Sequence, residues 1–138
     1  MEQASVQSGV CLCGSVEIKP GKFERHAGIC HCAMCRIWGG GPFMSVAGGK
    51  SPVIKGSGHI TVYRSSAWAE RAFCARCGTH LFYRNTDTGD HYVAAGLFPD
   101  APLELHHQIF IDKKPDWYAF AGDSDCLTEA EVLARHAS

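Results

Sequence analysis

The sequence of 138 residues has no long hydrophobic run, no marked excess of either charge, and no repeated or low-complexity tract. Its longest apolar stretches, such as residues 93–98, are much too short to cross a bilayer as a helix. The net charge of −1 gives no basis for general attraction to nucleic acid or anionic membranes. The N-terminal segment has neither a positive start nor an apolar centre, so a secretory signal is not expected. We therefore expect a cytoplasmic protein that binds neither membranes nor nucleic acid.

The composition is that of a globular protein, with 46% hydrophobic and 20% charged residues. The length is close to the commonest size of one domain, so we expect a single domain over residues 1–138. Fifteen glycines and short apolar runs favour strands joined by turns. We predict a mainly β fold with strands at residues 9–18, 23–31, 42–47, 59–65, 70–74, 80–85, 91–98 and 103–112.

Two segments have helical patterns. Residues 33–38 could form one or two turns of helix, and residues 128–137 predict a short C-terminal helix. The second segment opens with Thr128 and Glu131, which have the spacing of a capping box. Residues 85–90 are rich in turn formers and predict a hairpin between two strands.

Cysteine is abundant, and its eight positions fall into three groups and one isolated residue, Cys126. The groups read C-x-C, C-H-C-x-x-C and C-x-x-C. In a reducing compartment such a pattern is more typical of metal binding or catalysis than of disulfides. Because the number is even, a disulfide framework remains open as an alternative.

The first and last groups suggest a structural metal site. Alternate residues of a strand face the same side, so a C-x-C pair can point at one ion. The C-x-x-C spacing lets a tight turn wrap around a metal. Each pair is followed by a glycine, Gly14 or Gly78, which can adopt the left-handed conformation that such turns need. We predict a tetrahedral zinc site of four thiolates, from Cys11, Cys13, Cys74 and Cys77.

The central group has three cysteines, Cys30, Cys32 and Cys35, and no glycine follows the last of them. Three protein ligands and one exchangeable position are typical of a catalytic zinc, to which a substrate thiol could add as a thiolate. Two alternatives stay open. The fourth ligand position of this site could be filled by a side chain of the protein, such as His31, His26, Cys126 or another residue. The chain could also bind only one ion and share its ligands differently. His31 lies between two ligands and is expected to face away from them.

The sequence resembles the glutathione-dependent formaldehyde-activating enzyme family, which includes the domain of centromere protein V. The motifs "CHCAMCR", "RAFCARCGTHL", "AAGLFPD" and "HHQIFIDKKPDW" carry the resemblance, which extends from about Gly9 to Trp117. It implies an Mss4-like fold of coiled antiparallel sheets around two zinc ions. It also implies that the C-x-C and C-x-x-C pairs form the structural site and the central cysteines the second one. The activity it implies joins glutathione to formaldehyde and is classed as a carbon–sulfur lyase.

The chain departs from the family pattern near its C-terminus. Gln108 stands where the family has a histidine, and His107 is displaced by one position. Cys126 has no counterpart in the family pattern. His106 and His107 lie on a predicted strand, so we expect them to face opposite sides, with at most one of them near a site.

We therefore predict a zinc-dependent carbon–sulfur lyase-like enzyme or carrier for a thiol–aldehyde adduct such as S-hydroxymethylglutathione. A thiol held as thiolate at the central cysteines would attack a small aldehyde to give a hemithioacetal. Glutathione carries two carboxylates, which cationic side chains would bind, and the developing alkoxide needs a hydrogen-bond donor from the backbone of 39–41 or from a hydroxyl. The candidate substrate-binding residues are Arg36, Tyr63, Ser65, Ser66 and Arg71.

Two other functions use the same features. A zinc-stabilised binding module without catalysis would have a saturated second site that ignores added thiols. A methionine sulfoxide reductase-like protein would need two C-x-x-C pairs and a separate redox cysteine, whereas this chain has C-x-C and C-H-C-x-x-C.

Overall fold

The computed structural model describes residues 7–137, and these form two compact units. The first unit contains the described residues up to Arg25 together with Ser45–Pro102. The second contains His26–Met44 and the described residues from Leu103 onward. Each unit therefore combines two separate stretches of sequence. The single domain expected over residues 1–138 stays a prediction.

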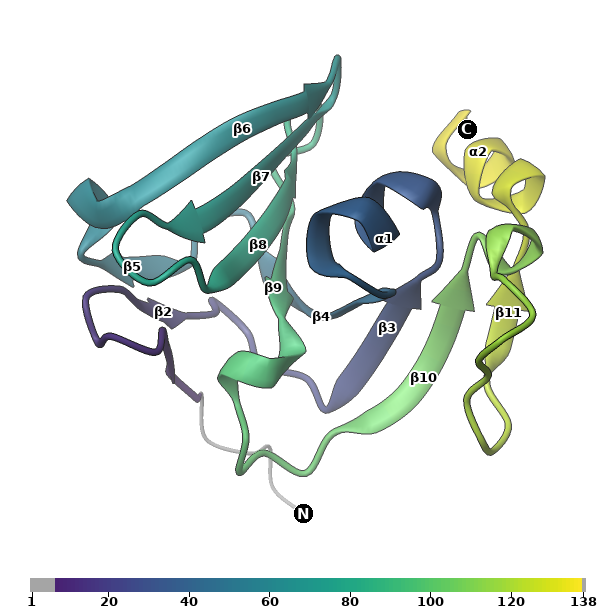
Figure 1. Cartoon of the computed structure of the whole chain (residues 1–138), viewed down its shortest axis with the longest axis horizontal. Helices are drawn as coiled ribbons and strands as arrows, with labels where there is room; N and C mark the ends of the chain where they lie inside the picture. Colours follow the sequence, from purple (N-terminus) through teal and green to yellow (C-terminus); the bar gives the residue numbers. More distant parts are fainter. Residues whose placement is uncertain (1–6, 138) are drawn as a thin grey trace. The chain divides into compact units, whose positions relative to one another are not determined.

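The main sheet of the first unit is antiparallel and has the strand order β4-β9-β8-β7-β6 (Figure 1). Ser45 to Gly49 of β4 pair with β9. Short turns connect β6, β7, β8 and β9 in chain order, as expected for antiparallel neighbours. The bounds are β4 (Phe43–Gly49), β6 (Ile60–Ser66), β7 (Ala69–Cys74), β8 (His80–Asn85) and β9 (His91–Ala94).

A smaller antiparallel sheet in the same unit has the order β1-β2-β5. Its strands are β1 (Gly9–Val10), β2 (Glu17–Lys19) and β5 (Val53–Lys55), and the 3₁₀ turn η1 (Ser57–His59) precedes β6. The core of the unit is apolar. Val16 and Ile18 are fully buried, as are Leu81 and Val93. Burying each such side chain stabilises the fold by about 1.5–3 kcal/mol. This core anchors the turns that carry the cysteines of the C-x-C and C-x-x-C pairs.

The second unit contains a sheet in which β10 (Glu104–Ile109) lies between β3 (His26–Cys30) and β11 (Asp125–Leu127). Both pairings of β10 are parallel, and Figure 1 shows the three strands running in the same direction. This differs from the antiparallel pairing expected from the family. Parallel neighbours need long connections, and the chain makes one here because residues 45–102 of the first unit separate β3 from β10. The helices of this unit are α1 (Ala33–Gly39) and α2 (Glu129–Ala137).

Most predicted elements are present, with shifted ends. The predicted strand 9–18 is split into β1 and β2 by a turn, and 91–98 ends in the 3₁₀ turn η2 (Ala95–Leu97). Likewise 103–112 ends in η3 (Ile111–Lys113). The short strands β5 and β11 were not predicted, because three residues are too few to show a periodic pattern.

Both predicted helices and the predicted hairpin are confirmed. In the capping box of α2, the Thr128 N–H donates to Glu131 Oε1 over 2.8 Å, and the Glu131 N–H donates to Thr128 Oγ1 over 3.2 Å. In the hairpin between β8 and β9, Asn85 Oδ1 accepts hydrogen bonds from the N–H groups of Asp87 and Thr88. Local side-chain chemistry thus fixes both segments.

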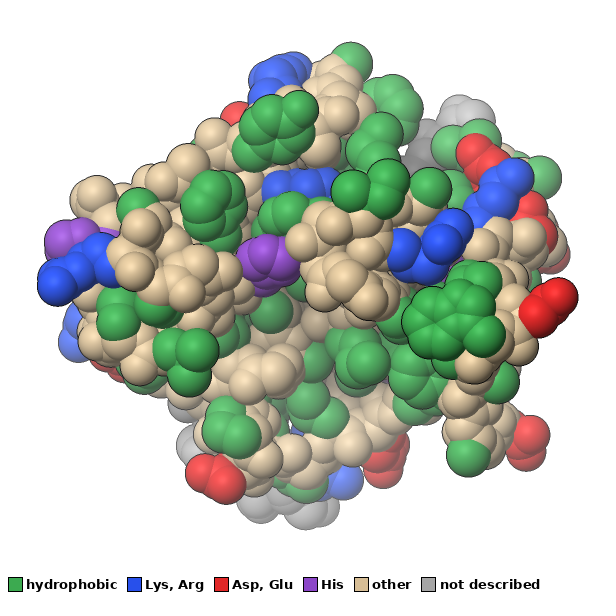
Figure 2. Space-filling view, in the orientation of Figure 1, with side chains coloured by type: hydrophobic (Ala, Val, Ile, Leu, Met, Phe, Trp, Pro, Cys, Tyr) green, Lys and Arg blue, Asp and Glu red, His purple; other side chains and the backbone are tan. Residues whose placement is uncertain are grey.

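Neither α1 nor α2 has the length and hydrophobicity that a helix needs to cross a membrane, and the same holds for every helix of the described chain. On the face seen in Figure 2, Lys and Arg side chains occur singly or in small groups among hydrophobic and uncharged ones. This mixed surface agrees with the net charge of −1.

Candidate metal centres

Four cysteines of the first unit meet where two turns come together. Cys11 and Cys13 lie in the turn between β1 and β2, while Cys74 ends β7 and Cys77 lies in the turn that leads to β8. Their Sγ atoms are all within 4.8 Å of one another, with 3.7 Å between Cys11 and Cys13 and 3.7 Å between Cys13 and Cys74. Four sulfurs around zinc at the usual Zn–S distance would lie about 3.8 Å apart. The cluster therefore fits a tetrahedral zinc site.

The sulfurs of Cys11 and Cys13 come together because both residues lie in a turn. An extended strand was expected there. The Gly14 N–H donates to the carbonyl of Cys11 over 3.0 Å, and the Gly78 N–H donates to that of Cys74 over 2.8 Å. Both glycines have positive φ, +83° and +78°, and a Cβ added at either would meet no atom within 4 Å. Glycine is therefore needed for its left-handed backbone and not for lack of space.

Two hydroxyls accompany the cluster, and sequence reasoning missed both. Ser15 Oγ lies 3.2 Å from Cys13 Sγ, and Thr79 Oγ1 lies 3.1 Å from Cys77 Sγ. The Thr79 hydroxyl, together with the Thr79 backbone, lowers the pKa of Cys77 to about 5, and the Ser15 hydroxyl lowers the pKa of Cys13. Each stabilises a thiolate, the form that binds metals. The available signal was the repeated order Cys-Gly-Ser and Cys-Gly-Thr.

The cysteine that begins each pair is buried. Cys11 is 3% exposed and accepts a hydrogen bond from the Val16 N–H over 3.3 Å, and Cys74 is fully buried. Burial raises the pKa of Cys74, because its thiolate loses the stabilising contact with water. A cation among the four sulfurs would replace that stabilisation. All eight cysteines of the chain are free, so the disulfide framework is not formed.

The central cysteines form a second cluster at the junction of β3 and α1 in the second unit. Cys30 ends β3, Cys32 is the N-cap of α1, and Cys35 lies in its first turn. Their Sγ atoms are within 4.8 Å of one another. The Cys35 N–H donates to Cys32 Sγ over 3.4 Å, so the sulfur takes the capping role that Ser or Asp usually fills. The two neighbouring thiols and burial raise the pKa of Cys30, a cost that a bound cation would offset.

Among the residues that the structure describes, no further Cys, His, Asp or Glu joins this cluster of three. His26 lies at the start of β3, and Cys126 is an exposed residue of β11 whose Sγ donates to the Ser124 carbonyl over 3.6 Å. The two clusters thus differ in their number of sulfurs, four in the first unit and three in the second.

His31 faces away from the sulfurs, as expected, and is fully buried. Its Nε2–H donates to Gln108 Oε1 over 2.8 Å, and its Nδ1 lies 2.8 Å from the hydroxyl of Tyr118. Gln108 Nε2 in turn donates to Ser124 Oγ over 2.9 Å. Burial lowers the pKa of His31, because the charged ring would lose its contact with water. Gln108, which replaces the histidine of the family pattern, therefore supports the segment between Cys30 and Cys32.

The candidate substrate-binding residues lie in both units. In the second unit, Arg36 is half-buried on α1, next to Cys35, and its Nε–H donates to the His31 carbonyl over 3.0 Å. In the first unit the structure brings Ser65 and Arg71 together, because the Arg71 Nε–H donates to Ser65 Oγ over 3.1 Å. Tyr63 and Ser66 lie on the same strand as Ser65, β6, and the Tyr63 side chain is exposed. That these residues bind a substrate stays a prediction.

The chain is similar to known proteins in sequence and in fold. The profile of a family described as glutathione-dependent formaldehyde-activating enzyme matches residues 6–113. An uncharacterized lyase of Schizosaccharomyces pombe is 35% identical over 127 residues, which cover 91% of this chain and 93% of that protein. A crystal structure of a Rhodobacter sphaeroides protein has a TM-score of 0.54 and 23% identity, covering 66% of this chain and 86% of the other. The structural likeness shows the fold, which is mainly β and Mss4-like, as expected.

Proposed function

Because the chain belongs to the glutathione-dependent formaldehyde-activating enzyme family, we propose that it is a zinc-dependent carbon–sulfur lyase that works at Cys30, Cys32 and Cys35. Its substrates would be a thiol such as glutathione and a small aldehyde such as formaldehyde. The relative in Schizosaccharomyces pombe, which carries the name of a lyase, supports the reaction class. The carrying observation is that the second cluster offers three sulfurs where the first offers four.

The two clusters would divide structural and chemical work. Four thiolates complete a tetrahedron, so the first cluster can stabilise the fold but has no place for a substrate. Zinc held by three thiolates would supply an open position and a positive charge that favours the thiolate form of an added thiol. The chain's own part is to hold three sulfurs in place, and the Cys35 N–H does so for the Cys32 sulfur at the start of α1.

The reaction itself is an addition to a carbonyl group. The thiol loses its proton, and its sulfur forms a bond to the carbonyl carbon as the π bond of the carbonyl group opens. The carbonyl oxygen then takes up a proton to become the hydroxyl of a hemithioacetal. In the reverse direction the carbon–sulfur bond breaks and the hydroxyl loses its proton. Arg36, beside Cys35 on α1, is the candidate partner for a carboxylate of glutathione. Tyr63, Ser65, Ser66 and Arg71 remain in the proposal as further substrate-binding residues.

The test is the rate at which glutathione and formaldehyde exchange with S-hydroxymethylglutathione. This addition is fast without a catalyst, so the rate is best measured at equilibrium by NMR magnetisation transfer, with and without protein. Cys32→Ser is the informative variant, because serine is a good N-cap and preserves α1 while it removes one thiolate. We expect the zinc-loaded protein to accelerate exchange and Cys32→Ser to lose at least about 90% of that acceleration.

The matched control is Cys126→Ser, which removes a thiol outside both clusters and should leave the rate unchanged. An unchanged rate in Cys32→Ser would contradict the proposal. If the wild-type protein neither accelerates exchange nor binds glutathione, either the thiol is a different one or the second cluster is a structural site, as in a zinc-stabilised binding module.

A further inference from the structure

Three histidines gather on one face of the sheet in the second unit, apart from the chemistry proposed above. His26 begins β3, and His106 and His107 are neighbours on β10. The rings of His26 and His106 stack with centroids 4.2 Å apart. His106 Nδ1 lies 3.0 Å from His107 Nδ1. None of these histidines belongs to either cysteine cluster.

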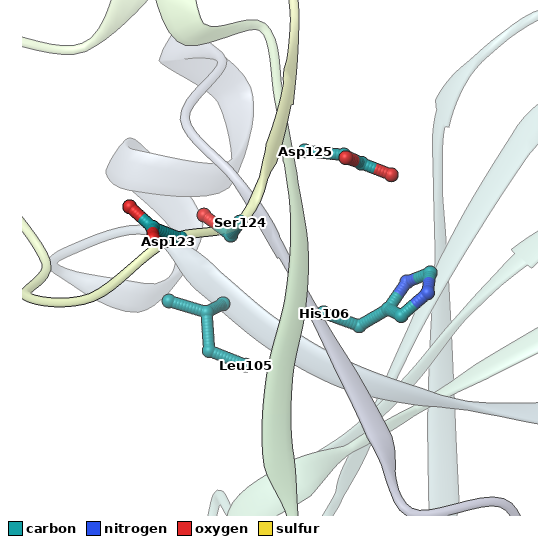
Figure 3. Close-up of a pocket in the computed structure, with 5 residues that line it drawn as sticks. All are labelled: Leu105, His106, Asp123, Ser124 and Asp125. Carbon is teal, nitrogen blue, oxygen red and sulfur yellow. The ribbon is translucent and has the colours of Figure 1, made fainter.

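The two neighbouring histidines share a face, which corrects the expectation that they point to opposite sides. The pairing of β10 with β3 shifts register between Leu105 and His107, so His106 is the extra residue of a β-bulge. Figure 3 shows His106 and Asp125 on one side of β10 and Leu105 on the other. His107 pairs with Asp125 of β11, which places both side chains on this same side. A bulge re-aims a side chain in this way.

The ring of His107 has a fixed place. It lies over Gly28 of β3, where a Cβ would come within 2.3 Å of His107 Nε2. Only glycine leaves room for the ring at this position. With Nε2 turned toward the sheet, Nδ1 points at His106. An open hollow of about 530 Å³ lies beside the pair and is lined by His106, His107, Asp125, Cys126, Leu127 and Arg135.

The separation of the two Nδ1 atoms matches one coordination geometry well. At a metal–nitrogen distance of about 2.1 Å, two nitrogens at right angles are about 3.0 Å apart, whereas two at a tetrahedral angle are about 3.4 Å apart. The observed 3.0 Å therefore suits a square-planar or octahedral ion. In the free protein one Nδ1–H donates to the other Nδ1, and moving that proton to Nε2 of its own ring would free both lone pairs without loss of a proton.

We propose that His106 and His107 form a binding site for a divalent transition-metal ion that prefers nitrogen ligands at right angles, such as Ni²⁺ or Cu²⁺. Asp125 lies on the same face but outside the direct ligand set, so the two imidazoles bind the ion and water completes the coordination. Arg135 also lines the hollow and its charge repels every cation, so we expect binding only by ions that form strong bonds to imidazole nitrogen. Imidazole pairs bind Ni²⁺ and Cu²⁺ more tightly than Mg²⁺ or Ca²⁺.

The test is a calorimetric titration of nickel chloride into the full-length protein, after its cysteine clusters have been saturated with zinc and free zinc removed. Ni²⁺ is preferred to Cu²⁺ because it does not oxidise thiols. Absorption bands of nickel–thiolate bonds, recorded in parallel, would reveal any binding to cysteine. We expect one Ni²⁺ per chain without such bands, and no displacement by millimolar Mg²⁺.

The variants His106→Gln and His107→Gln should each weaken Ni²⁺ binding by at least about tenfold, since each removes one of two imidazole ligands. Both side chains reach the surface, so the fold should survive, which circular dichroism checks. The matched control is His59→Gln, an exposed histidine of the first unit, which should bind Ni²⁺ like the wild type. Unchanged affinity in a variant that combines His106→Gln with His107→Gln, an equal loss in His59→Gln, or displacement by Mg²⁺ would each overturn the proposal.

Discussion

Gly14 and Gly78 each follow a pair of cysteines and hold the left-handed backbone that closes the turn around their sulfurs. The sequence allowed this to be predicted, because a glycine directly after each pair is a local signal. The hydroxyls of Ser15 and Thr79 were missed, since their hydrogen bonds to sulfur depend on how the turn folds. For single residues, the sequence predicts an unusual backbone conformation more easily than it predicts a contact between side chains.

Replacing Gly14 by alanine should destabilise the zinc-loaded protein by about 1–2 kcal/mol, the usual cost of a left-handed conformation for a residue with a Cβ. Gly58 is the matched control, because its φ is not positive and an added Cβ would meet no atom within 4 Å. Gly58→Ala should be neutral or slightly stabilising. Urea unfolding of both variants measures the difference. Equal losses would show that the left-handed turn is not what requires Gly14.

Thr79→Val should make the first cluster release zinc at a higher pH. The Thr79 hydroxyl is the largest of the causes that lower the pKa of Cys77 to about 5, so its removal raises that pKa and lets protons compete with the metal earlier on acidification. Thr61→Val, on the exposed part of β6, is the control. A chromophoric chelator follows zinc release from pH 7 down to pH 4. Coincident release curves for the two variants would rule out this role of Thr79.

At the scale of elements, periodicity located most strands, but pairing partners decided their details. The predicted strand 9–18 breaks because Cys11 and Cys13 occupy a turn, and β10 contains a bulge at His106. Gly14 marks the turn in the sequence, whereas the bulge has no signal in a single sequence because it depends on the neighbouring strand. The capping box of α2 was predicted correctly, because Thr128 and Glu131 interact within one helical turn.

The capping box makes the stability of α2 depend on pH. The hydrogen bond from the Thr128 N–H holds the pKa of Glu131 below its ordinary value of 4.5. Its contribution is complete above pH 4.5, where the unfolded carboxyl is ionised, and is lost as the pH falls through the lower pKa of the folded state. Glu131→Gln keeps an accepting oxygen but does not titrate. Hydrogen exchange should show the α2 amides losing protection below pH 4.5 in the wild type and less so in the variant. Parallel losses would contradict this role.

At the scale of the whole molecule, one cysteine cluster belongs to each compact unit. The grouping of the seven cysteines could be predicted, because their spacing and the family motifs agree. The parallel pairing of β10 could not, since it depends on a connection through the first unit. The first cluster has the four sulfurs of a complete tetrahedron and the second has only three, and the proposed chemistry depends on that difference.

The two clusters should contribute unequally to stability. The first joins sulfurs 61 positions apart in the chain, such as those of Cys13 and Cys74, whereas the second spans only residues 30–35. By analogy with a covalent cross-link, closing a loop of that length is worth about 4 kcal/mol. Cys13→Ser should therefore lower the thermal unfolding temperature by several degrees more than Cys32→Ser does. If both variants lower the unfolding temperature equally, the first cluster does not contribute more to stability than the second, which contradicts this prediction.

The most direct test of the open second cluster is native mass spectrometry of the purified protein with and without glutathione. We expect two zinc ions per chain and a glutathione adduct in the wild type, and one zinc ion without adduct in Cys32→Ser. Cys126→Ser should behave like the wild type. A wild-type protein that carries two zinc ions and takes up no glutathione, or a Cys32→Ser variant that keeps both the second ion and the adduct, would contradict a glutathione-accepting site at Cys30, Cys32 and Cys35.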